Sequence, residues 1–145
     1  MRFWRAWIIA STLLDGRLNR DLQDHHGISH TDYGVLVMLS EQEGYRMRMS
    51  ALAETLAMSK SRLSHQVSRM EKTGLVQRDG DRSDGRGIFA CLTPAGRTLL
   101  EKAAPTHVEG VRRYVVDLLT ESERAQATVF LERVVQGLRA IAPTD

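Results

Sequence analysis

Apolar residues recur at steps of three and four through most of the chain, which is the pattern of amphipathic helices. The first such segment runs from Arg2 to Gln23 and is predicted to be a helix; its apolar positions are Phe3, Trp4, Trp7, Ile8, Leu14, Leu18 and Leu22. Two tryptophans so near the start of the sequence need a surface that covers them. A partner subunit is one such surface, and a core within the same chain is the alternative.

A second helix is predicted from a turn and a cap. Gly27 marks the turn, and Ser29 followed by Asp32 resembles a capping box, in which two side chains satisfy free N–H groups at a helix start. The helix is expected to reach about Glu43 and to bury Tyr33, Leu36, Val37 and Leu39 or Ser40. Gly44 would close it, because glycine readily adopts the left-handed conformation that follows a helix.

Two short helices come next. Ser50 is predicted to cap a helix of about two turns over residues 51–57. Ser59 is predicted to cap the following helix, which continues to Lys72 and ends at Gly74. Two short helices joined by so tight a link make a helix-turn-helix candidate.

A β-hairpin is predicted directly after these helices. Residues 75–78 and 88–92 favour strands, and the polar, glycine-bearing segment 79–87 between them favours a turn. Residues 46–49 alternate charged and apolar side chains and would form a very short strand at most. A hairpin that follows a helix-turn-helix makes a winged helix, in which the hairpin is the wing.

Two further helices complete the pattern. Thr93 is predicted as an N-cap, with Pro94 at the first helical position, where proline is favoured. Pro105 lies inside this run, so we expect a kink or a break just before it. Thr120 and Glu123 form a capping box for a last helix. The predicted fold class is therefore mainly α with a small β-hairpin wing.

Composition agrees with a folded soluble domain. The 145 residues are 42% hydrophobic and 26% charged, which is ordinary usage for about one globular domain. Arg2, Arg5, Asp15 and Arg17 interrupt the N-terminal apolar run, so neither a membrane span nor a signal peptide is expected. A lone Cys91 cannot form an intramolecular disulfide, which fits a reducing interior and favours the cytoplasm.

Positive charge is concentrated in the middle of the sequence. The formal net charge is only +2, but residues 46–97 contain ten basic and five acidic side chains. This basic segment is flanked by mildly acidic ends, which favours one module that faces a polyanion.

The predicted helix over residues 59–72 has two different faces. Leu63, Val67 and Met70 share one face and would anchor the helix to its core. The opposite face is expected to present Ser61, Arg62, His65, Gln66 and Arg69, whose donors and acceptors suit base edges and phosphates. The free N–H groups near Ser59, Lys60 and Ser61 can hold a phosphate. The alternative is the solvated face of an ordinary surface helix.

Arginines of the predicted wing support a nucleic-acid target. Arg78, Arg82 and Arg86 are expected on a projecting loop, from which arginine can enter a narrow minor groove. Asp84 is the candidate partner that would orient Arg86. The alternative is a merely soluble turn.

Three segments together resemble the MarR family of winged-helix transcription regulators. They are TDYGVLVML, MSALAETLAMSKSRLSHQVSRMEKTGLVQR and DRSDGRGIFACLTPAG. The resemblance implies a homodimer whose terminal helices interlock and whose two recognition helices enter successive major grooves of a pseudo-palindromic operator. It implies recognition-helix positions at Ser61, Arg62, His65, Gln66 and Arg69, and a minor-groove arginine at Arg86.

On this basis the chain is expected to be a single domain over residues 1–145. Residues 30–100 would form the winged helix-turn-helix, and residues 1–24 and 105–142 the dimerisation helices. The expected function is that of a repressor of transcription that binds double-stranded DNA and has no cofactor.

The sequence leaves three kinds of signal that could release such a repressor from DNA. A small aromatic or anionic ligand could use Trp7, Tyr33 and either Arg112 or Arg113 for stacking and charge, although these residues also suit plain core and surface positions. Thiol sensing would rest on Cys91 alone. Zinc sensing would need ligands from His25, His26 and His30, joined by His107 through the fold.

The sequence also bears on two other classes of protein. No motif of a hydrolase, a nucleotide-binding loop or a metalloprotease is present, so nothing favours an enzyme. The stronger rival is a winged helix that binds a protein partner through its apolar terminal helices.

Overall fold

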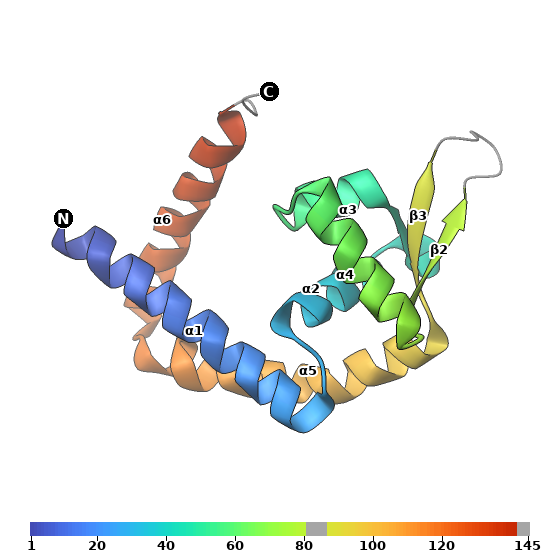
Figure 1. The fold of residues 1–145 in the computed structure, drawn as a ribbon. Coiled ribbons are helices and arrows are strands. Elements are labelled where there is room, and N and C mark those ends of the chain that lie inside the picture. The colour runs from blue at the N-terminus through green and yellow to red at the C-terminus, as the bar shows by residue number, and fades with distance from the viewer. Residues whose placement is uncertain (81–86, 142–145) are drawn as a thin grey trace. The chain divides into compact units, whose positions relative to one another are not determined.

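The computed structural model describes residues 1–80 and 87–141, which fall into two compact units that meet within one helix after Val108. The first unit contains α1 (Arg2–His26), α2 (His30–Ser40), a 3₁₀ turn η1 (Glu43–Tyr45), β1 (Arg46–Arg48), α3 (Met49–Thr55), α4 (Lys60–Lys72), β2 (Val76–Gly80), β3 (Ile88–Leu92) and most of α5 (Pro94–Tyr114) (Figure 1). The second unit continues with η2 (Val116–Leu118) and α6 (Glu121–Ala140). None of the described helices is long and apolar enough to cross a membrane.

Local caps explain where most helices begin. The Ser29 side chain accepts a hydrogen bond from the Asp32 N–H while the Asp32 carboxylate accepts one from the Ser29 N–H, so the predicted capping box of α2 is confirmed. Thr120 and Glu123 form the same reciprocal pair at the start of α6. Ser59 caps α4 as predicted, through a bond from the Arg62 N–H.

Three strands form one antiparallel sheet in the order β1-β3-β2. The hairpin pairs Val76 with Leu92 and Gly80 with Ile88, which confirms the predicted wing. The three-residue β1 pairs with the other edge of β3, where Arg46 faces Cys91. The predicted fold class, mainly helical with a small β wing, is confirmed, and the sheet gains a third strand from the short alternating segment.

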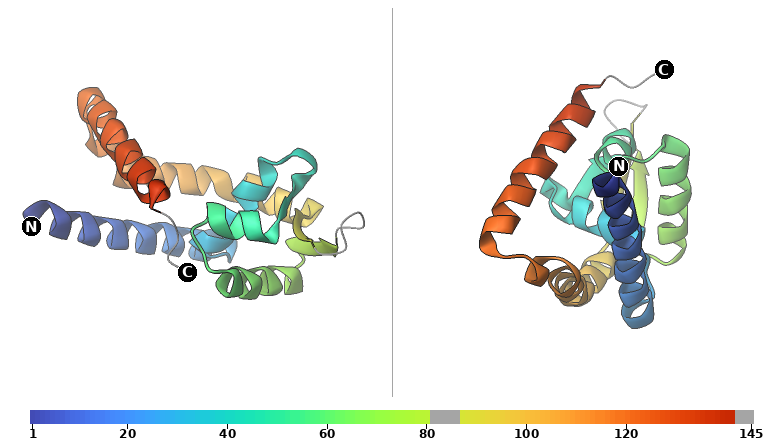
Figure 2. Two further views of the ribbon diagram at one scale, coloured as in Figure 1. Left: turned by 90° about the horizontal axis from the view of Figure 1, so that it is seen from above. Right: turned by 90° about the vertical axis from the view of Figure 1, so that its left-hand side faces the viewer.

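The core lies between α2, α3, α4, the sheet and the first half of α5. Leucines, valines and methionines from each element meet there, among them Leu36, Leu39, Leu52, Leu63, Val67, Met70, Val76 and Leu100. Gly96 allows the start of α5 to approach the sheet, since a Cβ at this position would lie 2.1 Å from the Leu75 carbonyl oxygen. Seen from two further sides, α4 lies at an outer margin of this unit (Figure 2).

Three predicted boundaries are wrong, and of the kink or break expected at Pro105 the break is absent. α1 continues to His26, where Gly27 in the left-handed conformation ends it, and α2 already ends at Ser40. α3 begins at Met49 without a side-chain cap, whereas Ser50 was expected to cap it. α5 runs through Pro105 without a break. An interior proline removes one helix hydrogen bond, but Leu100 and Ala103 on the turns before it are buried in the core.

The two terminal helices leave much apolar surface uncovered. In α1 only Leu18 and Leu22 are buried, whereas several large side chains nearer its start are exposed, namely Phe3, Trp4, Ile8, Ile9 and Leu13. No residue of α6 is buried, and its exposed apolar side chains are Val129, Phe130, Leu131, Val135 and Leu138.

Candidate nucleic-acid interface

The two faces of α4 separate as the sequence predicts, with one exception. Leu63, Val67 and Met70 are buried in the core. Ser59, Lys60, Ser61, Arg62, His65 and Arg69 are exposed. The first turn of α4 has no acidic residue, so the positive end of the helix dipole is not offset there.

Gln66 is the exception, because it is only 4% exposed and therefore does not lie on the outer face. Its side-chain amide donates a hydrogen bond to Oδ1 of Asp32 on α2, and its carbonyl oxygen accepts one from Nη2 of Arg69. The expectation that Gln66 faces solvent is wrong. Gln66 follows Leu63 by three residues and precedes Met70 by four, so helical spacing alone could have placed it on the buried face.

A broad groove runs along the outer side of α4. It has a volume of about 880 Å³ and is lined by Arg62, His65, Arg69 and Lys72 of α4 together with Ser29 and Thr31 at the start of α2. The sequence analysis assigned Ser29 only a capping role and did not single out Thr31 or Lys72 for binding. The sequence alone could not identify these residues as part of a groove, because the groove exists only once α2 packs beside α4.

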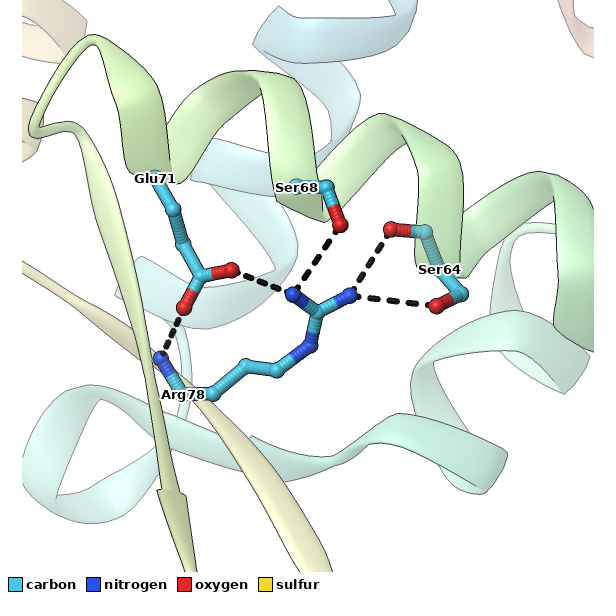
Figure 3. A network of polar contacts seen from close by, with 4 residues as sticks. All are labelled: Ser64, Ser68, Glu71 and Arg78. Carbon is cyan, nitrogen blue, oxygen red and sulfur yellow. Dashed lines mark hydrogen bonds and ion pairs between the residues drawn. The ribbon is translucent and has the colours of Figure 1, made fainter.

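Arg78 of β2 joins the wing to α4 (Figure 3). Its guanidinium donates to the Glu71 carboxylate, to Oγ of Ser68 at 3.1 Å and to the carbonyl oxygen of Ser64 at 2.8 Å. Its backbone N–H also donates to Glu71, at 2.8 Å. The expectation that Arg78 lies on a projecting loop is wrong, because its side chain is held against the helix. Glu71, the one acidic residue of α4, is thereby engaged in an ion pair.

A second hollow lies where α3, α4 and the wing come together. Its volume is about 320 Å³, and three cationic side chains border it, those of Arg48, Lys60 and Arg78. Ser50 and Ser64 add hydroxyl groups to the same wall. Positive charge with hydroxyl donors suits an oxyanion such as a phosphate.

Three predicted wing residues, Arg82, Asp84 and Arg86, lie outside the described residues, so the proposed pairing of Asp84 with Arg86 stays a prediction. In the described part of the sheet, Nη1 of Arg46 lies 3.9 Å from Oδ2 of Asp79. The Arg46 guanidinium also lies 4.0 Å from the centre of the Phe89 ring.

The four residues expected to bind a ligand belong to different units. Trp7 is half-buried on α1 with its ring 6.1 Å from that of Phe3, and Tyr33 is buried on α2. Arg112 donates to Asp117, and the Arg113 guanidinium lies 5.8 Å from the Tyr114 ring. A joint ligand site made by Trp7, Tyr33 and these arginines stays a prediction.

Histidines from two helices meet in the first unit. Nε2 of His30 on α2 lies 3.2 Å from Nε2 of His107 on α5. Nδ1 of His30 donates to the Asp15 carboxylate at 2.7 Å, and the His107 ring stacks on Tyr33 with ring centres 4.3 Å apart. Burial, with the nearby His30 as a second cause, lowers the pKa of His107 below its usual value, and burial raises the pKa of the Tyr33 hydroxyl.

Cys91, His25 and His26 are among the residues that could sense thiol oxidation or zinc. Cys91 is half-buried on β3, where burial raises the pKa of its thiol and so disfavours the reactive thiolate. His25 bonds to the carbonyl oxygen of Asp21, and His26 to Thr106. Within residues 1–80 and 87–141, no three His, Cys, Asp or Glu side chains are grouped to hold a metal ion.

Comparison with known proteins agrees with this winged helix. A family model described as the MarR family matches residues 26–87. The structure of AbsC, a MarR family transcriptional regulator from Streptomyces coelicolor, is 45% identical with a TM-score of 0.90, over 95% of this chain and 93% of AbsC. A second MarR family regulator from that organism, solved in complex with DNA, is 43% identical with a TM-score of 0.91, over 94% of this chain and 88% of its own.

A curated relative extends the same picture. The transcriptional regulator TtmR of Methylorubrum extorquens is 33% identical over 104 residues, which are 70% of this chain and 52% of TtmR. The match therefore spans about half the length of TtmR, whereas it spans nearly all of AbsC. The likeness to AbsC and to the DNA-bound regulator, above 40% identity along almost the whole chain, is decisive: the protein belongs to the MarR family of transcriptional regulators, and it is not an enzyme.

Proposed function

We propose that this protein binds double-stranded DNA as a homodimer, with one α4 from each subunit in successive major grooves, and represses transcription. The observation that carries the proposal is the outer face of α4. Arg62, Arg69 and Lys72 border its groove, and the single acidic residue of the helix, Glu71, is paired with Arg78. A face of this kind attracts a polyanion and offers donors that suit base edges.

Within this interface the residues divide by chemistry. The N–H groups at the start of α4, near Ser59, Lys60 and Ser61, would hold one phosphate, since helix N-termini favour anions. Arg62 and His65, exposed in the middle of the groove, are the proposed readers of base edges. Arg86, oriented by Asp84 and aided by Arg82, is proposed to enter the minor groove.

The second Streptomyces regulator supports the DNA target, because its structure was solved in complex with DNA and it is 43% identical to this chain. We propose that this protein acts in the cytoplasm, where it would reach chromosomal DNA.

The exposed apolar side chains of α1 and α6 support a homodimer. Phe3 and Trp4 are 62% and 58% exposed, and Leu138 on α6 is 64% exposed. Large apolar side chains exposed in this way on each helix favour a protein interface. We propose that residues 1–24 and 105–142 form the dimer and that residues 30–100 form the DNA-binding module of one domain.

Release from DNA is proposed to follow the binding of a small aromatic or anionic ligand. A ligand shifts an equilibrium only when it binds one state better than the other, and here it would favour a separation of the two α4 helices that no longer matches the grooves. Trp7 and Tyr33 are the proposed stacking contacts, and either Arg112 or Arg113 is the proposed cation.

Fluorescence anisotropy tests the DNA target. A labelled duplex from upstream of the protein's own gene and a scrambled duplex are titrated at several salt concentrations. Selective binding of one dimer, with log affinity falling against log salt by about 0.9 per neutralised phosphate, supports the proposal. Weak binding that is equal for both duplexes, and for duplexes selected from a random pool, would instead favour a winged helix that binds a protein.

A further inference from the structure

Gln66 lies between an anion and a cation that come from different elements. The anion is Asp32 in the first turn of α2, and the cation is Arg69, one turn further along α4. Gln66 is 4% exposed, whereas Arg69 is exposed and borders the groove along α4. A buried amide thus connects the inside of the module to a charged side chain on its proposed DNA-binding face.

The hydrogen bonds leave this amide one orientation. A carboxylate only accepts and a guanidinium only donates, so the NH₂ group of Gln66 must face Asp32 and its carbonyl oxygen must face Arg69, as the structure has them. Asp32 is held in turn, because its other oxygen accepts from the N–H and the hydroxyl of Ser29, both at 2.8 Å. Hydrogen bonds therefore link Ser29, Asp32, Gln66 and Arg69 in a row, and each of these side chains is held by at least one of them.

An arginine on a helix surface normally samples many rotamers, and ordering it on binding costs free energy. A guanidinium that is already held by one of its five N–H groups loses less freedom when the others meet a phosphate or a base. Gln66 can therefore raise affinity for DNA without touching DNA.

We propose that Gln66 is a positioning residue, fixed by Asp32, that holds the Arg69 guanidinium in the orientation in which it contacts DNA. This inference rests on the proposed function, since it assigns Arg69 a DNA contact. Gln66 would then not contact a base edge itself, in contrast to the expectation from the sequence.

A double-mutant cycle tests the proposal. Gln66→Met keeps a buried side chain of similar length but removes both hydrogen bonds, and Arg69→Met removes the cation. We expect Gln66→Met to weaken operator binding about tenfold, since a charge-assisted hydrogen bond is lost. In the Arg69→Met background the same change should have little further effect, because nothing remains to be positioned.

The other outcomes would overturn this inference alone or the proposed function with it. Wild-type affinity in Gln66→Met would overturn the inference while leaving the proposed function in place. An undiminished loss in the Arg69→Met background would also overturn it, since Gln66 would then act on its own. Absence of selective DNA binding by the wild type would overturn both proposals. Lys102→Met, at an exposed position of α5 outside the ranges proposed for DNA binding and dimerisation, is the control and should bind as the wild type does.

A second measurement needs no DNA and covers the case in which Gln66→Met folds poorly. Nitrogen-15 NMR of the arginine side chains in the free protein should show slowed guanidinium rotation for Arg69, assigned by its absence in Arg69→Met. Gln66→Asn keeps a buried amide but is one methylene shorter, so it cannot reach from Asp32 to Arg69, and Arg69 should gain mobility there. Unchanged rotation in that variant, or free rotation in the wild type, would contradict the proposal.

Discussion

Arg78 on the first strand of the wing is bound to Glu71 on α4 through both its guanidinium and its backbone N–H. This pair lies beside the proposed DNA-binding groove, and it both fixes the strand against the helix and neutralises the only carboxylate of α4 (Figure 3). The Arg78 contacts therefore tie β2 of the wing directly to α4.

Replacing Arg78 by Met should lower both stability and DNA affinity. The half-buried Glu71 carboxylate would lose its partner, which costs about 1–3 kcal/mol of unfolding free energy, and its charge would repel phosphates. Urea unfolding and anisotropy measure the two effects. In a Glu71→Gln background the same replacement should cost less, because no unpaired charge is left, and an equal cost in both backgrounds would show that the ion pair is unimportant.

Arg62→Ala is expected to relax base preference. Arg62 is exposed on the outer face of α4, and loss of a bidentate contact to a base costs about 1–3 kcal/mol at one position of the site. Binding to a panel of operator variants measures this. Lys72→Ala is the matched comparison, since a phosphate contact should weaken binding to all variants equally. If Arg62→Ala kept wild-type selectivity, Arg62 would not be a reader.

Arg86→Ala is expected to weaken DNA binding and to leave the dimer intact. A minor-groove arginine adds affinity through the negative potential of a narrow groove, whereas dimerisation is proposed to use the terminal helices. Anisotropy and light scattering separate the two properties. An unchanged affinity and salt slope would refute the assignment of Arg86 to the minor groove.

Acid should destabilise the fold through His107. Burial and the neighbouring His30 lower the pKa of His107 in the folded state, so at pH values below the unfolded pKa, about 6.5, the unfolded chain binds a proton that the folded chain excludes. The free energy of unfolding should therefore be fully present above that pH and fall as the pH drops through it.

Urea titrations between pH 5 and 8 measure this slope. His107→Gln should flatten it, while His25→Gln, at an exposed histidine of α1, should not. A slope that is the same in all three proteins would assign the acid sensitivity to other groups.

Local features were predictable from the sequence because their causes are local. The caps at Ser29, Ser59 and Thr120 were read correctly, since each depends on a partner three residues away. α3 has no such side-chain cap, and its predicted start at Ser50 is wrong.

The partners of Gln66 and Arg78 were not predicted, because packing creates them. Asp32 is 34 residues from Gln66 in the sequence, and Ser64 is 14 residues from Arg78. Polarity suggested that both side chains were free to bind outward, yet each is held by a neighbouring element. The groove gained Ser29 and Thr31 for the same reason, since only the fold brings the start of α2 beside α4.

The proposed function requires that α4 from each of two subunits lies in a major groove. The most direct test places a DNA-cleaving iron chelate on the outer face of this helix, at His65→Cys, in a Cys91→Ser background so that the chelate couples to one site. We expect two clusters of cuts on the operator, centred about 10 base pairs apart, as a dimer on successive grooves requires. Cuts spread evenly along the duplex, or no cuts while the protein remains bound, would contradict it.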